Sequence, residues 1–271
     1  MSAQRIAVAQ APSLPGQLDH NVGQAVGLIS AAADAGAGIV VLPELFLSGY
    51  DPAGIARDPA AHVVSAEDAQ CRRIADKAAA RGIAAIVGAA VETGAGVANA
   101  AIVFAPDGRV VHVYAKAKLW GEEAEVFAPG AGPVVVDLAG TRVGMSICFD
   151  AGFPEHMRAL ALAGADIIAC PAAFAVGAER RRYETYFPCR ALENTVMIAV
   201  SNAIGAQGGL EMFGDSVLFG PRGDELARVR EPTGLAAAAI DMDAIASARG
   251  DLPYLALVDK DPVEVPVINW R

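Results

Sequence analysis

A cysteine, a glutamate and a lysine each stand at the end of a strongly apolar segment. Cys148 follows the apolar residues 143–147 and precedes a helix that we expect to open at Phe153 and Pro154. A thiol near the positive end of a helix dipole is favoured as the thiolate, which is the nucleophilic form. Taken alone, Cys148 is more simply explained as a core residue, because cysteine is among the most buried residue types.

Glu44 comes directly after Pro43 and the apolar run at residues 39–42. Ligands of α/β proteins collect beyond the carboxyl ends of strands, so a carboxylate at this position can serve as an acid or a base. Apolar residues flank Glu44 on both sides and predict partial burial, which would raise its pKa toward the range of a general base. The alternative for a lone glutamate is a solvated loop acid.

Lys116 and Lys118 lie at the end of an expected strand, in the sequence Tyr-Ala-Lys-Ala-Lys. Alternation along a strand predicts that both side chains point to the same face of the sheet. Exposed lysines at the end of an edge strand are common, so a surface position is the simpler explanation for this pattern taken alone.

The elements that must position these residues alternate between strand and helix. Short continuous apolar runs indicate strands covered on both faces, and Ala-rich amphipathic segments indicate helices. The expected strands lie at residues 6–9, 39–42, 83–90, 100–105, 109–114, 134–138, 143–148, 167–170, 197–201, 216–219 and 225–229. The expected helices lie at residues 17–36, 66–82 and 179–195, with a further one opening at 153–154. Pro-Asp-Gly at residues 106–108 predicts a β-hairpin.

Hairpins mixed with helices predict an α/β layered fold rather than a pure Rossmann sheet or a TIM barrel. The chain has no Pro/Ser-rich linker and no repeat of fixed period, so we expect a single domain over residues 1–271. The tail from about residue 242 contains Pro253, Pro262 and Pro266. We expect this tail to be irregular and to pack over another surface, such as a partner subunit at a dimer interface.

The composition excludes several classes of function. Hydrophobic residues make up 54% of the chain and charged residues 19%, which is the opposite of the balance in a disordered chain. The net charge of −10 repels phosphate backbones and anionic membranes, so we expect neither as a partner. The apolar runs are broken well before the ~20 residues needed to span a bilayer, and the first residues do not resemble a signal peptide.

The cysteine pattern points to a reducing compartment. Cys71, Cys148, Cys170 and Cys189 show no CxxC spacing and no compact framework. We therefore expect free thiols and a cytoplasmic location. The chain has neither a His/Cys spacing of the metal-ligand type nor a phosphate-binding glycine motif, so we expect no metal ion, nucleotide or other cofactor.

Three segments taken together resemble the nitrilase, or carbon–nitrogen hydrolase, superfamily. They are Leu-Pro-Glu-Leu at residues 42–45, Tyr-Ala-Lys at 114–116, and Ile-Cys-Phe-Asp with Phe-Pro-Glu at 147–155. Further similar segments are Arg-Ala-Leu-Glu-Asn at residues 190–194, Asn202 followed by Gly205, and Gly214-x-Ser216 leading to residues 220–223. Each motif alone is weak, but all of them occur in the family's order and spacing, from about Ile6 to Tyr254.

The resemblance implies an αββα sandwich and a Glu–Lys–Cys triad. Carried over to this chain, Glu44 is the general base, Lys116 the oxyanion stabiliser and Cys148 the nucleophile. Glu123 lies in a segment similar to the one that carries a second active-site glutamate in the family, and it would orient Lys116. The family also implies a homodimer or a higher homo-oligomer, formed by packing of helical layers.

The resemblance is greatest to amidases. It implies an enzyme that hydrolyses a small linear carboxamide, aliphatic or ω-amino, to a carboxylate and ammonia through a cysteine thioester. Phe149 and Asp150 follow the nucleophile, where nitrilases proper commonly carry Trp-Glu, and this difference favours amides or N-carbamoyl compounds over nitriles. Lys118 stands where the family usually has histidine, and Tyr183 where a tryptophan is common, which leaves the identity of the substrate open.

Other classes of function are not excluded by the sequence. A Cys–His hydrolase would need His20, His62, His112 or His156 beside Cys148, but none of these lies in a recognisable partner motif. An N-carbamoyl hydrolase and a nitrilase are alternatives within the family, and a catalytically silent scaffold is the non-enzymatic alternative. By position, the residues expected to line the substrate pocket are Tyr50, Trp120, Phe149 and Phe174, although core packing accounts for each of them equally well.

Overall fold

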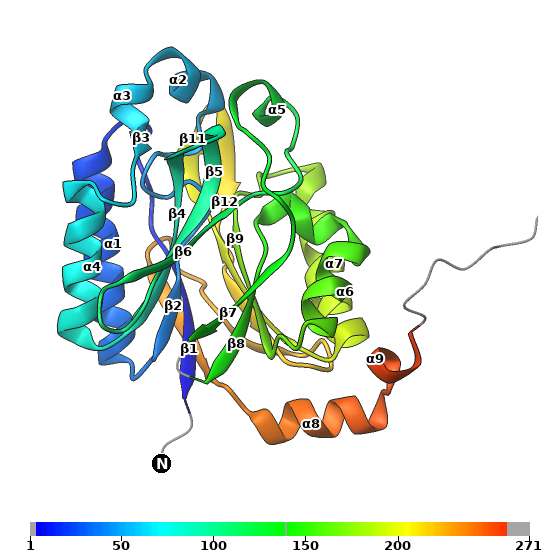
Figure 1. Ribbon diagram of the computed structural model, residues 1–271. Coiled ribbons are helices and arrows are strands. Elements are labelled where there is room, and N and C mark those ends of the chain that lie inside the picture. The colour runs from blue at the N-terminus through cyan, green and yellow to red at the C-terminus, as the bar shows by residue number, and fades with distance from the viewer. Residues whose placement is uncertain (1–3, 139, 259–271) are drawn as a thin grey trace, which may run out of the picture.

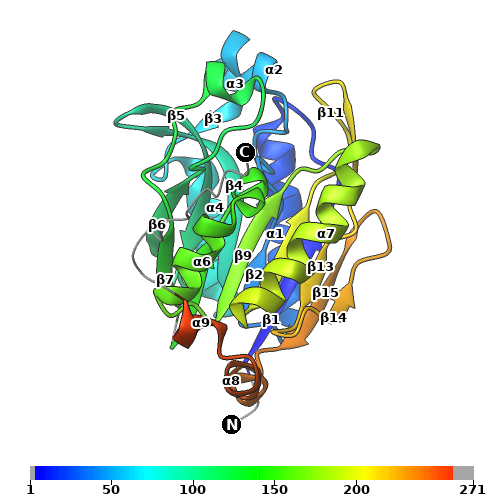
Figure 2. The same cartoon turned by 90° about the vertical axis from the view of Figure 1, so that its right-hand side faces the viewer.

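Two mixed β-sheets pack face to face in the computed structural model, and helices cover the outer side of each sheet (Figure 1). The structure describes residues 4–138 and 140–258. Helices α1 (Leu18–Asp34) and α4 (Ala69–Arg81) cover the first sheet. Helices α6 (Pro154–Leu162) and α7 (Ala178–Asn194) lie in front of the second sheet in Figure 2. The αββα sandwich expected from the sequence is therefore confirmed.

The first sheet has seven strands in the order β15–β1–β2–β4–β5–β6, with β3 also paired to β4. In chain order they are β1 (Arg5–Gln10), β2 (Ile39–Val41), β3 (Val63–Val64), β4 (Ala84–Thr93), β5 (Gly96–Phe104), β6 (Val110–Ala115) and β15 (Gly234–Ala239). Strands β1, β2 and β4 are parallel to one another, whereas β15, β5 and β6 run antiparallel to their neighbours. The expected hairpin at residues 106–108 joins β5 to β6 and is confirmed.

The second sheet has six strands in the order β14–β13–β10–β9–β8–β7. They are β7 (Val134–Leu138), β8 (Thr141–Met145), β9 (Ile167–Ala172), β10 (Met197–Asn202), β13 (Val217–Phe219) and β14 (Glu225–Arg228). Strands β8, β9 and β10 are parallel. A separate hairpin, β11 (Ile204–Gln207) with β12 (Leu210–Phe213), rises from the end of β10.

Alternation along the strands sorts the core into two layers. Ile6 and Val8 of β1 belong to the cluster between the sheets, which includes Ile167 of β9. Ala7 and Ala9 of the same strand belong to the cluster under α1 and α4. Successive side chains of a strand point to opposite faces, so a continuous apolar run is what a strand covered on both faces requires.

The carboxyl ends of the parallel strands meet at one end of the sandwich, at the top in Figure 1. Short helices follow them there: α2 (Pro52–Arg57), α3 (Pro59–His62), α5 (Glu123–Val126) and the 3₁₀ helix η1 (Cys148–Gly152). The turn after β2, the segment after β6 and the turn after β8 carry the three residues of the expected triad. This end of the fold is therefore where ligands of α/β proteins collect.

Two expectations about the elements are wrong. The strand expected at residues 143–148 ends at Met145, and Cys148 instead opens η1. The tail after residue 241 is not irregular within the described residues, because it forms α8 (Met242–Asp251) and α9 (Tyr254–Leu257). Pro253 stands directly before α9, while Pro262 and Pro266 lie outside the described residues.

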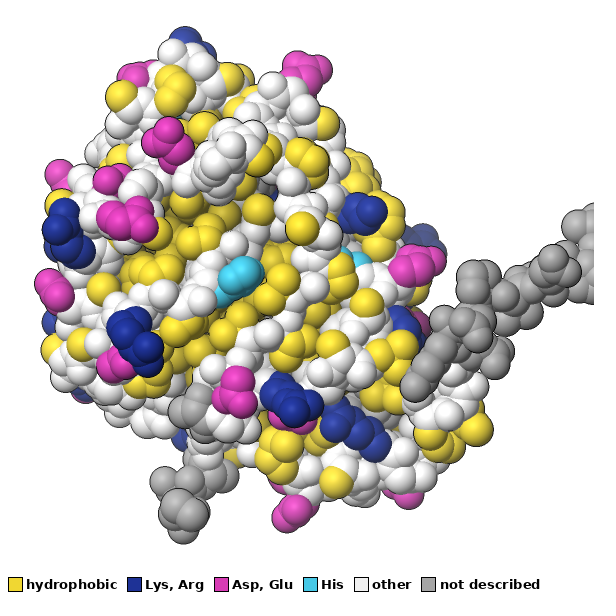
Figure 3. Space-filling model, in the orientation of Figure 1, with side chains coloured by type: hydrophobic (Ala, Val, Ile, Leu, Met, Phe, Trp, Pro, Cys, Tyr) yellow, Lys and Arg dark blue, Asp and Glu magenta, His cyan; other side chains and the backbone are white. Residues whose placement is uncertain are grey.

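The surface drawn in Figure 3 carries hydrophobic side chains across its centre, with charged groups mainly toward its rim. The edge strand β6, at the front in Figure 1, exposes Val110 and Val111. On the helical side, Leu162 at the end of α6 and Leu192 on α7 are also exposed. Over the described parts of the chain, 4–138 and 140–258, no helix has both the length and the apolar character needed to cross a bilayer.

Candidate active site

Glu44 lies in the turn that follows β2, where both sheets hold it. Its backbone N–H donates to the oxygen of Ala172 at the end of β9, at 3.4 Å. The turn also packs against Gly88 of β4 so closely that a methyl group there would lie 2.1 Å from the Pro43 oxygen. Leu45 completes the turn with a positive φ of 48°. Glu44 is only 1% exposed, which confirms the burial expected from its apolar flanks.

Lys116 is the first residue beyond β6. Its backbone N–H donates to the oxygen of Asn99 on β5, and its own oxygen accepts from the N–H of Gly130, both at 2.8 Å. The side chain is fully buried. Its Nζ lies 2.6 Å from Oε1 of Glu44 and 2.8 Å from the carboxylate of Glu123. The ammonium group is thus held between two carboxylates, and two backbone hydrogen bonds hold the main chain of Lys116.

Glu123 opens α5 and is fully buried. Besides Lys116, it accepts hydrogen bonds from the hydroxyl of Tyr50 and from the backbone N–H of Trp120, each at 2.8 Å. Both carboxylate oxygens are occupied, so this acid has little capacity left for a substrate. Its contacts are those of a residue that positions Lys116.

Asn99 is a fully buried residue of β5 that sequence reasoning missed. Its Nδ2 donates to Oε1 of Glu44 at 2.7 Å, the same oxygen that accepts from Lys116. The second oxygen of Glu44, Oε2, has no hydrogen-bond partner within the described part of the chain. Buried carboxylate oxygens normally have partners, so this free oxygen is a site where a proton can be taken up.

Cys148 opens η1 with a positive φ of 46°, an uncommon conformation for a residue other than glycine. Asp150 holds the turn, because its carboxylate accepts from the N–H of Ile147 at 2.9 Å and from the N–H of Lys118 at 2.8 Å. The hydroxyl of Tyr114 donates to the same carboxylate at 2.8 Å. Strained backbone of this kind persists only where the surroundings fix it. The turn leaves Cys148 9% exposed, at the floor of a cleft.

The surroundings of Glu44, Lys116 and Cys148 raise the pKa of all three groups. Burial raises the pKa of Glu44 to about 7, because it outweighs the lowering by Lys116. Burial alone would lower the pKa of Lys116, but the charges of Glu44 and Glu123 raise it, so the ammonium persists. Burial and the charge of Glu44 raise the pKa of the Cys148 thiol well above its usual value. The expectation that a helix dipole favours the thiolate is therefore wrong, and the thiol needs a base.

A narrow cleft leads from the surface to Cys148. It encloses about 370 Å³, including the part that is open to solvent at its mouth. The four residues expected to line a pocket, Tyr50, Trp120, Phe149 and Phe174, all line this cleft. Trp120 packs edge-on against Phe149, with ring centroids 4.7 Å apart. The aromatic walls restrict the cleft to a slim group.

A family model described as carbon-nitrogen hydrolase matches residues 5–250. The chain belongs to the carbon–nitrogen hydrolase family. Similar proteins include a nitrilase from Pyrococcus abyssi, 36% identical over 216 residues that cover 79% of this chain and 80% of that protein. An omega-amidase from Homo sapiens is 29% identical over 245 residues, which cover 86% of this chain and 87% of that protein.

Solved structures of an amidase from Nesterenkonia sp. AN1 are similar over almost the whole chain. One, a variant with acrylamide added at its active-site cysteine, has a TM-score of 0.80 and 32% identity, and covers 94% of this chain and 100% of that one. Another variant of the same amidase, in complex with acrylamide, has a TM-score of 0.81. The chain is thus a hydrolase of non-peptide carbon–nitrogen bonds, in the amidase-like branch of the nitrilase superfamily.

Several residues that line the hydrolase cleft were missed by sequence reasoning. They are Ala173, Glu179, Arg182, Tyr186 and Leu210. Glu179, Arg182 and Tyr186 share one face of α7, at a spacing of three or four residues. The sequence does contain this helical spacing. It does not say which face of α7 meets the cleft, because that depends on how the helix packs on the second sheet.

Lys118 and the four histidines, which were considered from the sequence, do not line the cleft of this hydrolase. Strand β6 ends at Ala115, so alternation does not extend to Lys118, and the shared face expected for the two lysines is wrong. The side chain of Lys118 is exposed, with its ammonium 5.2 Å from the centre of the Phe153 ring. None of the four histidines, all of them described by the structure, lines the cleft. The rings of His62 and His156 instead bond to backbone oxygens.

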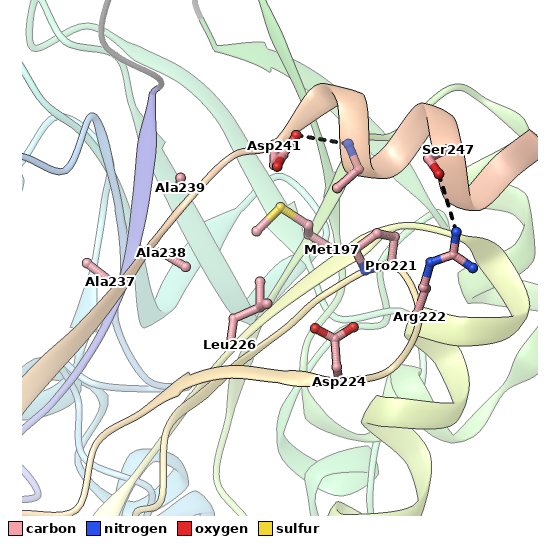
Figure 4. A pocket seen from close by; sticks show the side chains of 11 residues that line it. Met197, Pro221, Arg222, Asp224, Leu226, Ala237, Ala238, Ala239, Asp241 and Ser247 are labelled. Carbon is pink, nitrogen blue, oxygen red and sulfur yellow. Dashed lines mark hydrogen bonds between the residues drawn. The ribbon is translucent and has the colours of Figure 1, made fainter.

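A larger hollow of about 1000 Å³, including the part open to solvent, lies between the two sheets' edge strands and α8 (Figure 4). Its floor consists of Met197, Leu226 and Ala237–Ala239. Two of its polar groups bind neighbours in the hollow, because Asp241 caps α8 by accepting from the N–H of Ala244, and Arg222 donates to Ser247. The hollow includes no residue of the triad, so its size alone does not make it the reaction site.

Proposed function

We propose that this hydrolase cleaves a small linear carboxamide, with Cys148 as nucleophile, Glu44 as general base and Lys116 as oxyanion stabiliser. The observation that carries the proposal is the asymmetry of Glu44. Two donors occupy Oε1, while Oε2 has no hydrogen-bond partner among the described residues, and the charge of Glu44 acts with burial to raise the pKa of the Cys148 thiol. A buried base with a pKa of about 7 suits proton transfer near neutral pH.

The first half of the reaction makes a thioester. Glu44 takes the proton of the Cys148 thiol as the sulfur attacks the amide carbon. The negative charge that develops on the amide oxygen is stabilised by the Lys116 ammonium and by the backbone N–H of Phe149. The carbon–nitrogen bond then breaks, and Glu44 returns its proton to the departing nitrogen, which leaves as ammonia.

The second half of the reaction regenerates the enzyme. A water molecule gives a proton to Glu44 and attacks the thioester carbon, and the same two donors stabilise the second oxyanion. The carbon–sulfur bond breaks, the carboxylic acid product leaves and loses its proton to water, and the Cys148 thiolate takes the proton back from Glu44. Glu123, whose oxygens hold Lys116, Tyr50 and Trp120, acts as a positioning residue throughout.

The shape of the cleft and the ligand of a similar amidase both support a substrate with a small acyl group. The narrow cleft and its aromatic walls suit a slim chain and exclude a folded peptide. The similar Nesterenkonia amidase has been solved with butyramide. A nitrile would have to gain protons on the way to a thioimidate, a different demand on the same carboxylate, although one similar protein is named a nitrilase. Cleavage of N-carbamoyl compounds is the second candidate, because their carbonyl can be attacked in the same way.

Ammonia release from matched amides, N-carbamoyl compounds and nitriles of equal chain length tests the proposal. We expect the highest kcat/KM for the amide, and no turnover by Cys148→Ala, whose stability should fall only by the small cost of the lost sulfur. Cys71→Ala serves as the control, because this buried cysteine lies on α4, away from the cleft. A preference for the carbamoyl member would support the second candidate. A preference for nitriles, or near-normal rates with Cys148→Ala, would reject the amidase proposal.

We further propose that the enzyme is a cytoplasmic homodimer. All four cysteines lie in the described part of the chain and are free thiols, as suits a reducing compartment. The dimer would join the helical layers, with the tail from about residue 242 at its interface. We also expect full activity after treatment with EDTA; loss of activity that zinc restores would favour a metal-assisted reaction instead.

A further inference from the structure

The carboxylate of Asp150 is shared by the two chain segments that supply the proposed oxyanion donors. Its Oδ2 accepts from the backbone N–H of Ile147, in the nucleophile turn, at 2.9 Å, and from the hydroxyl of Tyr114, near the end of β6, at 2.8 Å. Its Oδ1 accepts from the backbone N–H of Lys118 at 2.8 Å. One side chain thus joins the nucleophile turn to the segment that carries the catalytic lysine.

On the lysine segment, the bonds to Asp150 flank Lys116. Tyr114 stands two residues before this lysine and Lys118 two residues after it. Strand β6 ends at Ala115, so the backbone N–H of Lys118 is held by the Asp150 carboxylate and not by the ladder of the sheet. The carboxylate therefore fixes the course of the chain through Lys116, whose ammonium is one of the two proposed oxyanion donors.

On the nucleophile turn, the bonds to Asp150 enclose two residues. The N–H of Ile147 donates to the Asp150 carboxylate, and the N–H of Asp150 donates to the oxygen of Ile147 at 3.0 Å. One of the residues between them is Cys148, held at a positive φ of 46°. The other is Phe149, whose N–H is the second proposed oxyanion donor. The same carboxylate therefore holds the chain on both sides of this donor too.

Water is largely excluded from this network. Asp150 is fully buried, and Tyr114 and His156 are 1% and 5% exposed. Nε2 of His156 lies 3.4 Å from the Tyr114 hydroxyl and 3.2 Å from the oxygen of Met145. Burial and the charge of Asp150 raise the pKa of the Tyr114 hydroxyl well above its usual value, so the hydroxyl stays protonated and can donate. Hydrogen bonds to a charged group in such surroundings are strong, so the two segments resist displacement relative to each other.

We propose that Asp150 is a positioning residue that sets the spacing between the Lys116 ammonium and the backbone N–H of Phe149. Oxyanion donors contribute most when their geometry is fixed before the charge develops, because no reorganisation is then needed during the reaction. Asp150 is not among the described residues that line the cleft, so it acts through these two donors. The proposal rests on the proposed amidase function and adds a determinant of its rate.

Asp150→Asn tests the proposal with little change in shape. In either orientation of the new amide, its NH2 group faces a backbone N–H, donor against donor, so at least one bond of the network is lost. We expect kcat to fall by about 100-fold at an unchanged KM, because the two donors act on charge that develops only in the transition state. Tyr114→Phe keeps the ring and removes one bond, so kcat should fall by about tenfold.

Reaction of Cys148 with methyl methanethiosulfonate separates positioning of the donors from damage to the turn. This small reagent transfers a methylthio group to a thiolate and has no carbonyl oxygen, so its rate needs Glu44 and an accessible Cys148 but not the spacing of the two donors. Mass spectrometry of the peptide that contains Cys148 follows the reaction, since Cys189 is exposed and also reacts. In both variants this rate should be nearly unchanged while amide hydrolysis falls.

Tyr183→Phe is the matched control. Tyr183 is also buried, and its hydroxyl donates at 2.7 Å to the backbone oxygen of Asp215, in the segment before β13. The loss of this bond should lower stability and leave both rates near those of the wild type. A fall in kcat equal to that of Tyr114→Phe would show that any lost buried hydroxyl has this effect, and it would overturn the proposal.

Other outcomes also decide against the role of Asp150. Normal kcat in a folded Asp150→Asn, a change in KM alone, or equal falls in amide hydrolysis and in the methylthio reaction would overturn the proposal while the amidase function stands. If Asp150→Asn does not fold, the same outcomes in Tyr114→Phe decide. If the wild type hydrolyses no amide, the amidase function fails and this proposal fails with it.

Discussion

Glu44 can act as a base because its two oxygens have different surroundings. Lys116 and Asn99 both donate to Oε1, and no donor in the described structure reaches Oε2. The donors keep the carboxylate ionised near neutral pH against the cost of burial, and they leave one oxygen for the thiol proton. The same two contacts therefore set both the pKa of the base and the direction from which it takes a proton.

The dependence of kcat/KM on pH should follow the ionisation of Glu44. The base works only as the carboxylate, so kcat/KM should fall as the pH drops through about 7. Asn99→Leu removes a donor that lowers the pKa of Glu44, and the acid limb of the profile should move upward by about one pH unit or more. Profiles of kcat/KM against pH for both enzymes check this.

Asn194→Leu is the control for the Asn99 variant. Asn194 is also fully buried, and its Nδ2 donates to a backbone oxygen within α7 at 2.9 Å. Its loss should lower stability and leave the pH profile in place. An acid limb that stays fixed in Asn99→Leu, or that moves equally in the two variants, would contradict the role given to Asn99.

The two lysines of the Tyr-Ala-Lys-Ala-Lys segment should differ sharply. Lys116→Ala and Glu44→Gln each remove a charge that acts in the transition state, so each should lower kcat by at least about 100-fold. Lys118→Ala should have a small effect, because this side chain is exposed outside the cleft. Steady-state kinetics of the three variants decide the matter, and equal losses at the two lysines would contradict the assignment of Lys116.

At the residue scale, the sequence predicted the groups that react but not those that assist them. Glu44, Lys116 and Cys148 could be found because each follows an apolar run and matches a family segment. Asn99 has no such signal, because a lone asparagine within an apolar run only lowers the predicted strand propensity. Arg182 was missed because the orientation of α7 depends on packing, which one sequence does not show.

At the scale of elements, two turns from different sheets bring the site together. The turn after β2 contacts Gly88 of β4 and Ala172 of β9, and the turn after β8 is held by the carboxylate of Asp150. Neither turn has a regular conformation, because Leu45 and Cys148 both adopt positive φ angles. The rigidity of the site is therefore supplied by the sheets and not by the turns themselves.

Gly88→Ala should damage the site from a distance. The added methyl group would lie 2.1 Å from the Pro43 oxygen and 2.7 Å from the Leu45 nitrogen, so the turn must move and take Glu44 with it. We expect a loss of about 1–3 kcal/mol in the free energy of unfolding and a loss of activity of about 100-fold, as small misplacements of catalytic groups produce. Melting curves and kcat measure the two effects.

Gly94→Ala provides the comparison. Gly94 lies between β4 and β5, and a methyl group there meets nothing within 4 Å. This variant should have normal activity and nearly normal stability. Normal activity in Gly88→Ala would show that the position of the Glu44 turn does not depend on this packing.

The sequence predicted most strands and the larger helices because buried apolar runs and amphipathic periods are local signals. It missed β15, whose Ala-rich sequence is typical of a helix; pairing with β1 overrides that preference. It also read the proline-bearing tail as irregular, although the prolines fall outside α8 and leave Met242–Asp251 free to form a helix. The order of the strands in the two sheets depends on contacts between residues far apart in the chain, so it was not predictable from the sequence.

At the scale of the whole molecule, the proposed dimer can be tested by light scattering. We expect a dimer at micromolar concentration. Replacing both Leu162 and Leu192 by glutamate should produce monomers, because these side chains are exposed on the helical layer proposed as the interface. Val111→Glu alters an equally exposed residue on the edge strand β6 and should leave the dimer intact. A monomeric wild type, or a dimer broken only by Val111→Glu, would contradict the helical interface.

The central claim is that the amide is cleaved through a thioester on Cys148. Mass spectrometry of enzyme quenched with acid during turnover of a small carboxamide tests it most directly. We predict an added mass equal to the amide minus ammonia, located on the peptide that contains Cys148. Absence of any adduct, together with ammonia release by Cys148→Ala, would contradict the account.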